Sequence, residues 1–292
     1  ETLATLRTLT YALDGTGQSV ALHQLTRRQF NGLGQLATEH VAHTQDGGPV
    51  AVRDAQLAAG TVTRYTYDEA GRLVKTEAAQ GSSEVREGNL RFDVFGQLIG
   101  ELTGEGSTHL LGGMSESQLD ALYAQYGTRH SYDLLGRRIE SIDAAGNQTW
   151  IFYDAQGRPT FVVRGVHDSG NVPNAQGEVT ETRYDAFGQV IDSIAYTGRI
   201  TLGVPGSRAS AQSAIATLGA IGASDSRTQY AYDRRGLLIQ RTDAEGYRST
   251  YAYNAFGEMA TQQDWELNNS LRRTVTSTWD KRGLLTNVAE AG

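Results

Sequence analysis

The sequence contains no cysteine, which excludes a disulfide framework, a cysteine-ligated zinc site and a thiol nucleophile. Basic residues are outnumbered, 26 against 33 acidic ones, and a net charge of −7 argues against a protein that grips nucleic-acid phosphates with a basic face. No apolar run approaches the roughly 20 residues that span a bilayer, and no signal peptide is visible. Because the first residue is Glu1 rather than Met, we expect a fragment of a longer protein.

Glycine is abundant, with 34 of 292 residues, and this predicts many turns. One phrase recurs along the chain: an aromatic residue, then Asp or Asn, two free residues, and Gly. Nine copies in register are too many for chance and indicate an internal repeat. The nine copies are Phe30-Asn31-Gly34, Tyr67-Asp68-Gly71, Phe92-Asp93-Gly96, Tyr132-Asp133-Gly136, Tyr153-Asp154-Gly157, Tyr184-Asp185-Gly188, Tyr232-Asp233-Gly236, Tyr253-Asn254-Gly257 and Trp279-Asp280-Gly283. A degenerate tenth copy is Leu13-Asp14-Gly17.

The shortest spacing between copies defines the repeat unit. Two pairs of neighbouring tyrosines, Tyr132 with Tyr153 and Tyr232 with Tyr253, stand 21 residues apart. A second turn signal follows about ten residues after the first, as Asp and Gly in two units and as Gly alone in three others. These second signals are Asp143 with Gly146, Asp243 with Gly246, and Gly81, Gly106 and Gly198. Each unit is therefore predicted to be a strand, a turn, a strand and a turn.

The residue types explain the turns physically. Asp or Asn at the first position accepts hydrogen bonds from the backbone N–H groups ahead of it, and Gly three residues later tolerates positive φ. Apolar and polar residues alternate before the turn, as in Tyr65-Thr66-Tyr67, whereas helical spacing is lacking. We predict an all-β fold of serial antiparallel hairpins that form one repeat array over residues 1–292.

Longer gaps between copies mark insertions near residues 107–131 and 199–229. In the first, the stretch from Ser115 to Tyr123 predicts a short helix, with Ser115 and Gln118 at capping-box spacing. In the second, Ala209 to Ala223 is small and weakly apolar, which fits either a marginal helix or a mobile loop.

The stretches Tyr67 to Leu73 and Tyr132 to Arg138 resemble the YD or Rhs repeat. The resemblance implies a β-sheet ribbon that spirals into a hollow shell, as in bacterial Rhs polymorphic toxins, the shell components of insecticidal toxin complexes and, more distantly, teneurins. In the toxins the shell encloses a C-terminal toxic segment and often ends in a self-cleaving motif with Asp-Pro. None of the four prolines here follows Asp, so we expect the cap and the toxin to lie outside this chain.

Four groups of residues could form a ligand-binding site, and for each group a purely structural role is the alternative. The turn Asp residues could bind calcium, but one Asp per turn is too few, and turn capping is favoured. The repeated tyrosines could stack on sugars, although packing ladders within the sheet are favoured. His40 and His43 lack a third metal ligand at a recognisable spacing, and Gly32 to Ala37 only superficially resembles a dinucleotide-binding turn.

We therefore predict a non-catalytic wall segment of a secreted or cell-surface bacterial protein, without cofactor or metal. Its partners would be the rest of the shell and an enclosed cargo, with no nucleic acid and no membrane span. The alternative is an extracellular module that binds carbohydrate or a cell-surface receptor, with Tyr123 and Tyr126 as contact residues. An enzyme is least favoured, because neither a nucleophile with its base nor a metal set can be assembled.

Overall fold

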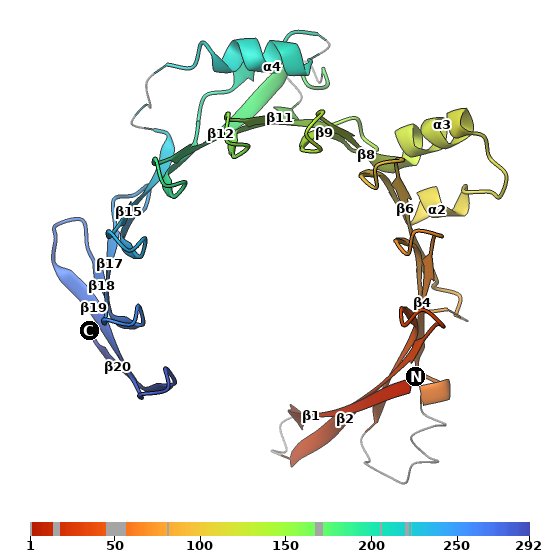
Figure 1. Ribbon diagram of the computed structural model, residues 1–292, viewed down its shortest axis with the longest axis horizontal. Coiled ribbons are helices and arrows are strands. Elements are labelled where there is room, and N and C mark those ends of the chain that lie inside the picture. Colours follow the sequence, from red (N-terminus) through yellow and green to blue (C-terminus); the bar gives the residue numbers. More distant parts are fainter. Residues whose placement is uncertain are drawn as a thin grey trace. The chain divides into compact units, whose positions relative to one another are not determined.

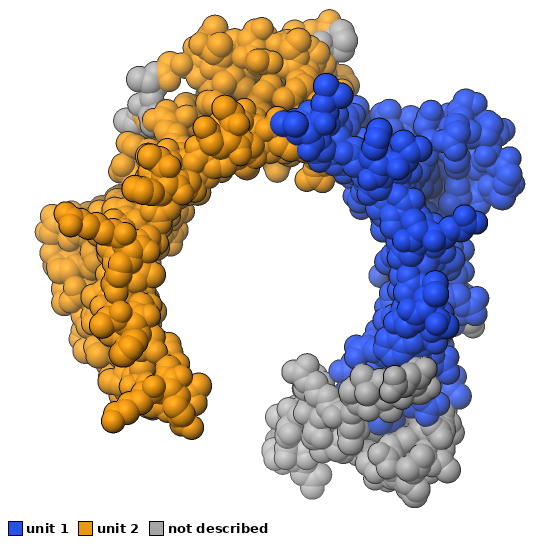
Figure 2. Space-filling view, in the orientation of Figure 1, with its two compact units in different colours: residues 1–136, 142–145 blue, residues 137–141, 146–292 orange. Residues whose placement is uncertain are grey.

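A computed structural model describes the backbone of residues 2–13, 18–44, 57–80, 82–166, 172–204, 206–219, 222 and 224–292. The chain divides into two compact units, shown in different colours in Figure 2. The first comprises residues 1–136 and 142–145, and the second comprises residues 137–141 and 146–292.

The first unit is an antiparallel sheet in which each strand pairs with the next along the chain, from β1 to β8. Its strands are β1 (Thr2–Leu13), β2 (Gln18–Phe30), β3 (Leu36–Thr44), β4 (Thr61–Tyr67), β5 (Leu73–Ala78), β6 (Arg86–Phe92), β7 (Leu98–Thr103) and β8 (Gly127–Tyr132). Two helices, α2 (Glu105–Thr108) and α3 (Glu116–Tyr126), follow β7 and precede β8 along the chain. Both lie beside the strands, on one face of the sheet (Figure 1).

The second unit continues the same pattern of pairing. Its strands are β9 (Arg138–Ile142), β10 (Gln148–Tyr153), β11 (Pro159–Val166), β12 (Gln176–Tyr184), β13 (Val190–Ala195), β14 (Ile200–Thr201), β15 (Ser226–Tyr232), β16 (Leu238–Thr242), β17 (Arg248–Tyr253), β18 (Met259–Trp265), β19 (Leu271–Trp279) and β20 (Leu285–Ala291). The short β14 pairs with the start of β12, and β13 pairs directly with β15. The helix α4 (Arg208–Ile215) lies between β14 and β15.

These pairings confirm the predicted all-β fold of serial antiparallel hairpins. A feature that the sequence did not reveal is a β-bulge at the aromatic residue of the repeat motif. The register shifts at this residue in eight motif hairpins: at Phe30, Tyr67, Phe92, Tyr153, Tyr184, Tyr232, Tyr253 and Trp279. A bulge bends its strand and redirects a side chain. Each aromatic ring therefore does not follow the regular alternation of side chains between the two faces of the sheet.

In the first unit, α3 supplies the cover for one face of the sheet. Leu102 on β7 is fully buried, and it packs with Leu122 and Tyr123 of the helix. The helix can approach because Gly100 has no side chain: a Cβ there would lie 2.5 Å from the Tyr123 ring. Arg91 of β6 fixes the helix from the other side through ion pairs of 2.6 Å to Glu116 and 2.8 Å to Asp120.

In the second unit, the core lies between α4 and the central strands. Trp150 and Val163 are fully buried, and Val179 is nearly so; they pack with Ala211 of the helix. The guanidinium of Arg208 donates to the carbonyl oxygens of Ile139 and Ile151, and it stacks on the Phe152 ring at 4.2 Å. The helix is thus joined to the sheet by apolar packing and by bonds to the backbone.

The insertions contain the helices that the sequence suggested. The predicted capping box at Ser115 and Gln118 is confirmed, with both of its hydrogen bonds present. In the second insertion the helix alternative holds for the first part of the stretch from Ala209 to Ala223, since α4 covers Arg208–Ile215 with Ser207 as its N-cap. Residues 220, 221 and 223 lie outside the described residues. Whether the two units form one continuous repeat array over residues 1–292 stays a prediction.

The second turn signals are only partly correct. Gly146 and Gly246 have positive φ within turns, as predicted. Gly106, however, lies in α2, and Gly198 does not have positive φ, because the insertions replace the short hairpin loop at these places. Gly81 and the tenth motif copy lie outside the described residues.

Candidate functional site

The structure places a tight turn at all nine motif copies. In each, the Gly N–H donates to the carbonyl oxygen of the Asp or Asn at 3.0–3.1 Å, and the Gly has φ between +76° and +87°. The side-chain Oδ1 of the same Asp or Asn accepts backbone N–H groups. In Asp185, for example, it accepts from Phe187 at 2.8 Å and from Gln189 at 2.9 Å. The carboxylate or amide oxygen therefore holds the turn closed from inside.

The aromatic residue of the motif reaches back to the preceding repeat. Its polar atom donates to the backbone carbonyl six residues after the preceding motif aromatic, and we call this contact the aromatic latch. Seven latches of 2.7–2.9 Å are present: Tyr67 to Leu36, Tyr132 to Leu98, Tyr153 to Arg138, Tyr184 to Pro159, Tyr232 to Val190, Tyr253 to Leu238, and Trp279 Nε1 to Met259. Phe30 and Phe92 have no polar atom and make none.

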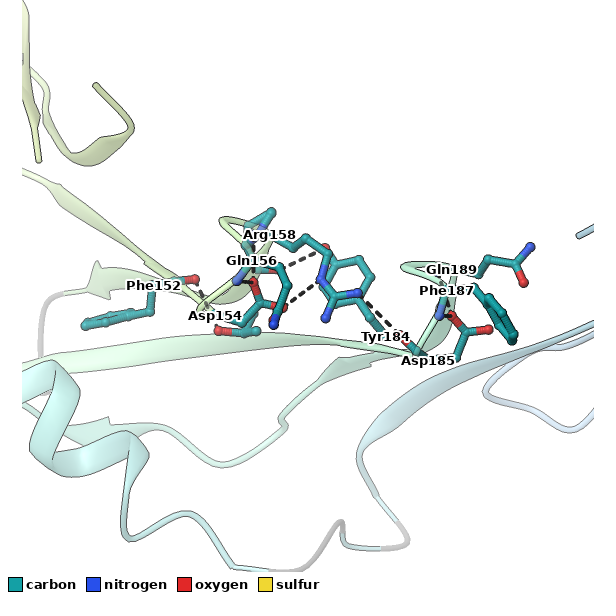
Figure 3. A network of polar contacts seen from close by, with 10 residues as sticks. Phe152, Asp154, Gln156, Arg158, Tyr184, Asp185, Phe187 and Gln189 are labelled. Carbon is teal, nitrogen blue, oxygen red and sulfur yellow. Dashed lines mark hydrogen bonds and ion pairs between the residues drawn. The ribbon is translucent and has the colours of Figure 1, made fainter. Parts of the chain in front are cut away.

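The residue directly after the motif glycine reaches forward to the next turn. Gln35 donates to the carbonyl oxygen of Gly71, and Gln189 donates to that of Gly236, both at 2.9 Å. Arginine at this position makes two contacts at once. Arg158 donates to the carbonyl oxygen of Asp185 at 3.3 Å, and it stacks on the Tyr184 ring at 4.6 Å (Figure 3).

We call the motif turns, the aromatic latches and these forward contacts together the turn ladder. Arg72 repeats the arrangement of Arg158, over Phe92 at 4.8 Å, and Arg137 stacks on Tyr153 at 4.6 Å. The sequence did carry a signal for this position, because Gln or Arg follows the motif glycine in six of the nine copies. These six residues are Gln35, Arg72, Gln97, Arg137, Arg158 and Gln189.

The electrostatics of the turns follow from the same bonds. The pKa of Asp68 is lowered from its ordinary value by the backbone N–H of Arg72 and by the Arg72 side chain. The same holds for Asp233 and Asp280, through Leu237 and Leu284 N–H. For Asp154 partial burial raises the pKa, but the bonds from Arg158 outweigh it and lower the pKa. The ionised form is thus part of the folded turn.

A second polar arrangement lies beside the core of the second unit. Glu181 and Asp192 are more than nine-tenths buried, and both are paired: Glu181 with Arg183 at 2.6 Å, and Asp192 with Arg227 at 2.7 Å. Tyr196 donates to Glu181 at 2.6 Å, and burial together with this bond raises the pKa of Tyr196 to about 12. Buried charges need such partners. A shift in the pairing of β12, β13 or β15 would separate the charges, so the network favours the register that is observed.

The metal interpretations find little support in the geometry. His40 and His43 are three residues apart on β3, so their side chains leave opposite faces of the sheet and cannot share an ion. The described residues contain no group of three or more His, Asp or Glu that could hold a metal. The carboxylates of the turns are engaged by backbone N–H groups, as described above.

The structure also describes the stretch Gly32 to Ala37 and the two tyrosines expected to contact a receptor or glycan. Gly32 to Ala37 is a motif turn followed by the strand β3 rather than by a helix, so it lacks the frame of a dinucleotide site. Tyr123 lies on the face of α3 that packs on β7 and is only 3% exposed, so its assignment as a contact residue for a receptor or glycan is wrong. Tyr126 stacks against His109, with ring centroids 4.6 Å apart.

Comparison with known proteins supports the repeat assignment. The family described as RHS Repeat matches residues 53–83 and 232–266, which contain the motifs that begin at Tyr67, Tyr232 and Tyr253. These two segments therefore match the Rhs repeat, as the resemblance of the motifs implied. No curated protein matches the chain. Among the described residues, no helix has both the length and the apolar character needed to cross a membrane.

Several solved structures are similar at low identity. The crystal structure of TcdB2-TccC3-Cdc42 is 12% identical with a TM-score of 0.28, and the match covers 98% of this chain and 21% of that one. TcdB2-TccC3 without its hypervariable C-terminal region gives the same values. A porin-like protein from Bacteroides uniformis is 8% identical with a TM-score of 0.22, over 99% of this chain and 94% of that one. The chain thus spans 21% of the length of the TcdB2-TccC3 chains.

Proposed function

We propose that this chain of Rhs repeats is a non-catalytic wall segment of a large secreted bacterial protein that encloses a C-terminal toxin or effector. The observation that carries the proposal is the turn ladder. Neighbouring repeats are tied by aromatic latches at seven motifs and by forward contacts at several, and some junctions have both: Tyr232 reaches back to Val190, and Gln189 reaches forward to Gly236. A sheet built in this way gains stability from neighbouring repeats and can grow by adding hairpins.

The chemistry of the motif residues favours a structural role over a catalytic one. Their polar atoms are already engaged within the sheet. The Asp Oδ1 accepts backbone N–H groups of its own turn, and the Oδ2 of Asp68 and Asp154 accepts from an arginine side chain. The Tyr hydroxyls donate to carbonyl oxygens of the preceding repeat, as Tyr232 does to Val190. A catalytic group needs a polar atom that is available to substrate. The repeats therefore supply rigid wall, and the toxic activity would belong to the enclosed segment.

The experiment that tests encapsulation uses the full-length protein, purified under native conditions and then analysed by denaturing intact-mass spectrometry. We expect two polypeptides that co-purify, one of them a short C-terminal piece, because a closed shell retains its cleaved cargo. As a control, the same sample is unfolded before a second purification step, which should separate the two pieces. A single uncleaved chain that exposes its C-terminal part to protease would contradict the proposal.

A surface-binding role is the second candidate, and one observation favours it. A hollow of about 340 Å³ in the second unit is lined by Tyr247 and Trp265, which suit a sugar ring. Its charged lining is Arg248, Arg272 and Arg273 against Asp243 and Asp264, so positive charge exceeds negative and an acidic group on the sugar is favoured. The Arg248 guanidinium stacks on Trp265 at 4.9 Å, and its Nε is buried with no hydrogen-bond partner among the residues that the structure describes. Binding of acidic oligosaccharides to a glycan array, abolished by Trp265→Ala but kept by Tyr251→Ala, would favour this role.

A further inference from the structure

The turn between β18 and β19 carries a three-residue pattern that has no part in the turn ladder. Asn268-Asn269-Ser270 has the form Asn-x-Ser, and its middle residue is not Pro. This is the acceptor pattern of N-linked glycosylation, in which an oligosaccharide is joined to the Asn side chain. So short a pattern also arises by chance, and the geometry around it decides whether it can act as an acceptor.

The whole pattern is accessible. It lies after the last residue of β18 and before the first residue of β19, and residues 267–272 are all exposed. Two backbone hydrogen bonds of 2.9 Å close the turn, from the Glu266 N–H to the Ser270 carbonyl oxygen and from the Asn269 N–H to the Glu266 carbonyl oxygen. A turn with exposed bonds and exposed side chains opens locally at low cost, so a transferase can gain access to it without unfolding the sheet.

The side chain of Asn268 leaves its nitrogen available. Its Oδ1 accepts the Ser270 N–H at 2.9 Å and the Ser270 hydroxyl at 2.6 Å. Its Nδ2 makes no hydrogen bond to the part of the chain that the structure describes. Because the oxygen and the nitrogen of an amide point in different directions, the bonds to Ser270 hold the oxygen in the turn and leave the nitrogen to solvent.

A second match to the pattern, Asn147-Gln148-Thr149, is closed by the fold. The Gln148 N–H donates to Oδ1 of the buried Asn174 at 3.0 Å, and Asn147 is engaged by a polar contact of its own. Thr149 lies within β10, where it pairs with Arg164 of β11. Release of this stretch would break strand pairing, so the folded chain offers only the turn at Asn268 among these two matches.

The residue two positions before the Asn also separates the two matches. Glu266 stands there for Asn268, whereas Ala145 stands there for Asn147. Acceptor sites of bacterial oligosaccharyltransferases carry an acidic residue at this position. Glu266 makes an ion pair of 3.6 Å with Arg272, which is largely exposed. An exposed pair contributes little, so Glu266 can exchange Arg272 for a basic group of a transferase.

We propose that Asn268 is an acceptor site for an N-linked oligosaccharide. The proposal rests on the secretion proposed above, because such transferases act on chains that have crossed the cytoplasmic membrane. In the reaction, Nδ2 attacks the anomeric carbon of a polyprenyl-diphosphate-linked oligosaccharide. The bond from nitrogen to that carbon forms, and the bond from that carbon to the diphosphate oxygen breaks. The diphosphate leaves with the electron pair, and one Nδ2 proton passes to a base of the transferase.

The first test uses the purified, folded chain, so its result does not depend on secretion or on an enclosed cargo. The chain is incubated with a bacterial oligosaccharyltransferase and a polyprenyl-diphosphate-linked heptasaccharide, and the product is analysed by intact-mass spectrometry and peptide mapping. We expect the mass of one heptasaccharide to be added to the peptide that contains Asn268. Asn268→Gln and Ser270→Ala should abolish the addition, and Glu266→Gln should remove most of it.

Ala145→Glu is the matched control, because it gives Asn147 the same acidic residue two positions before it. In the folded variant Asn147 should stay unmodified, whereas a synthetic peptide of residues 140–154 with the same substitution should be modified. Modification of both sites in the folded variant would contradict the role of the fold. A folded wild-type chain that gains no mass would overturn the proposal, and it would leave the encapsulation of a cargo untouched.

The second test examines the full-length protein recovered from the culture medium of its source. Peptide mapping should find a glycan on Asn268 and none on Asn147. A secreted protein with an unmodified Asn268 would overturn the proposal, even where the first test succeeds. Circular dichroism of each variant confirms that the sheet is retained.

Discussion

The hydroxyl of Tyr232 donates to the carbonyl oxygen of Val190 at 2.9 Å, although the two residues are 42 positions apart in the sequence. The insertion that contains β14 and α4 lies between them, yet the latch has the same geometry as that of Tyr253 to Leu238, only 15 positions apart. The insertion therefore leaves the sheet after β13 and returns at β15 without interrupting the turn ladder.

Removing this latch should destabilise the second unit. We expect Tyr232→Phe to lower the free energy of unfolding by about 0.5–1.5 kcal/mol, the net value of one hydrogen bond. The measurement is urea denaturation followed by circular dichroism. Tyr230→Phe is the control, because Tyr230 lies on the same strand and its hydroxyl has no hydrogen-bond partner among the described residues. Equal losses in both variants would show that the latch contributes nothing.

The converse change should stabilise the first unit. Phe92 occupies a latch position without a polar atom, and the equivalent acceptor is the carbonyl oxygen of Leu73. We expect Phe92→Tyr to raise the free energy of unfolding by up to about 1 kcal/mol. Thermal unfolding monitored by circular dichroism would detect the gain. A loss of stability would mean that the added hydroxyl finds no acceptor beside the stacked Arg72.

Substitutions at Arg158 test how much the forward contact contributes to stability. Arg158→Leu removes the ion pair with Asp154, the bond to Asp185 and the stacking on Tyr184, and we expect a loss of about 1–2 kcal/mol in the free energy of unfolding. Arg158→Gln should lower the free energy of unfolding by less, because Gln189 shows that a glutamine at this motif position can still donate to the next turn. Arg199→Leu, which breaks an exposed pair with Glu178, is the control and should cost about 0–1 kcal/mol.

Stability should fall in acid because of the turn carboxylates. Asp68, Asp154, Asp233 and Asp280 have folded pKa values below the ordinary 3.8, so the unfolded chain binds more protons than the folded chain near that pH. The stability that these four carboxylates contribute is fully present at a pH above the unfolded pKa of 3.8. It is lost as the pH falls through the lowered pKa values of the folded chain.

Asn at all four positions should flatten this acid dependence, because Asn254 shows that an amide oxygen holds the same turn. Denaturation midpoints between about pH 2 and about pH 6 provide the measurement. Glu69→Gln, beside Asp68 but exposed and outside the turn bonds, is the control and should leave the slope unchanged. The prediction fails if the quadruple variant keeps the slope of the wild type.

The motif glycine can be tested within a single turn. Gly34 has φ of +77°, whereas Gly32 does not have positive φ, and a Cβ at either position meets no atom within 4 Å. We therefore expect Gly34→Ala to cost about 1–2 kcal/mol in backbone strain and Gly32→Ala to cost little. Equal effects of the two substitutions on the unfolding midpoint would argue against strain as the cause.

The fold was predictable because its signals are local. Asp and Gly at fixed positions determine each turn, and the alternation before Tyr67 determines the strand that enters it, so the serial hairpins followed from the sequence. The aromatic latch was not predictable, because its acceptor is a backbone carbonyl and no residue type marks it. The buried pair of Asp192 with Arg227 depends on the pairing of β13 with β15 across the insertion, which no short pattern encodes.

Insertions were harder to predict than repeats for the same reason. Ser115 and Gln118 identified α3 through local capping, but nothing near Tyr123 indicated that its ring lies on Gly100 of a strand more than 20 residues earlier. The ring was therefore assigned to solvent, although it is buried.

The seven latch acceptors belong to Leu36, Leu98, Arg138, Pro159, Val190, Leu238 and Met259. These residues share no size, charge or shape, because only their main-chain oxygens take part. A hairpin can thus be duplicated, deleted or exchanged for another without a compensating change in the hairpin that receives it. The ladder accordingly permits the gene to lengthen or shorten in whole units, while the side chains of each hairpin stay free to diverge.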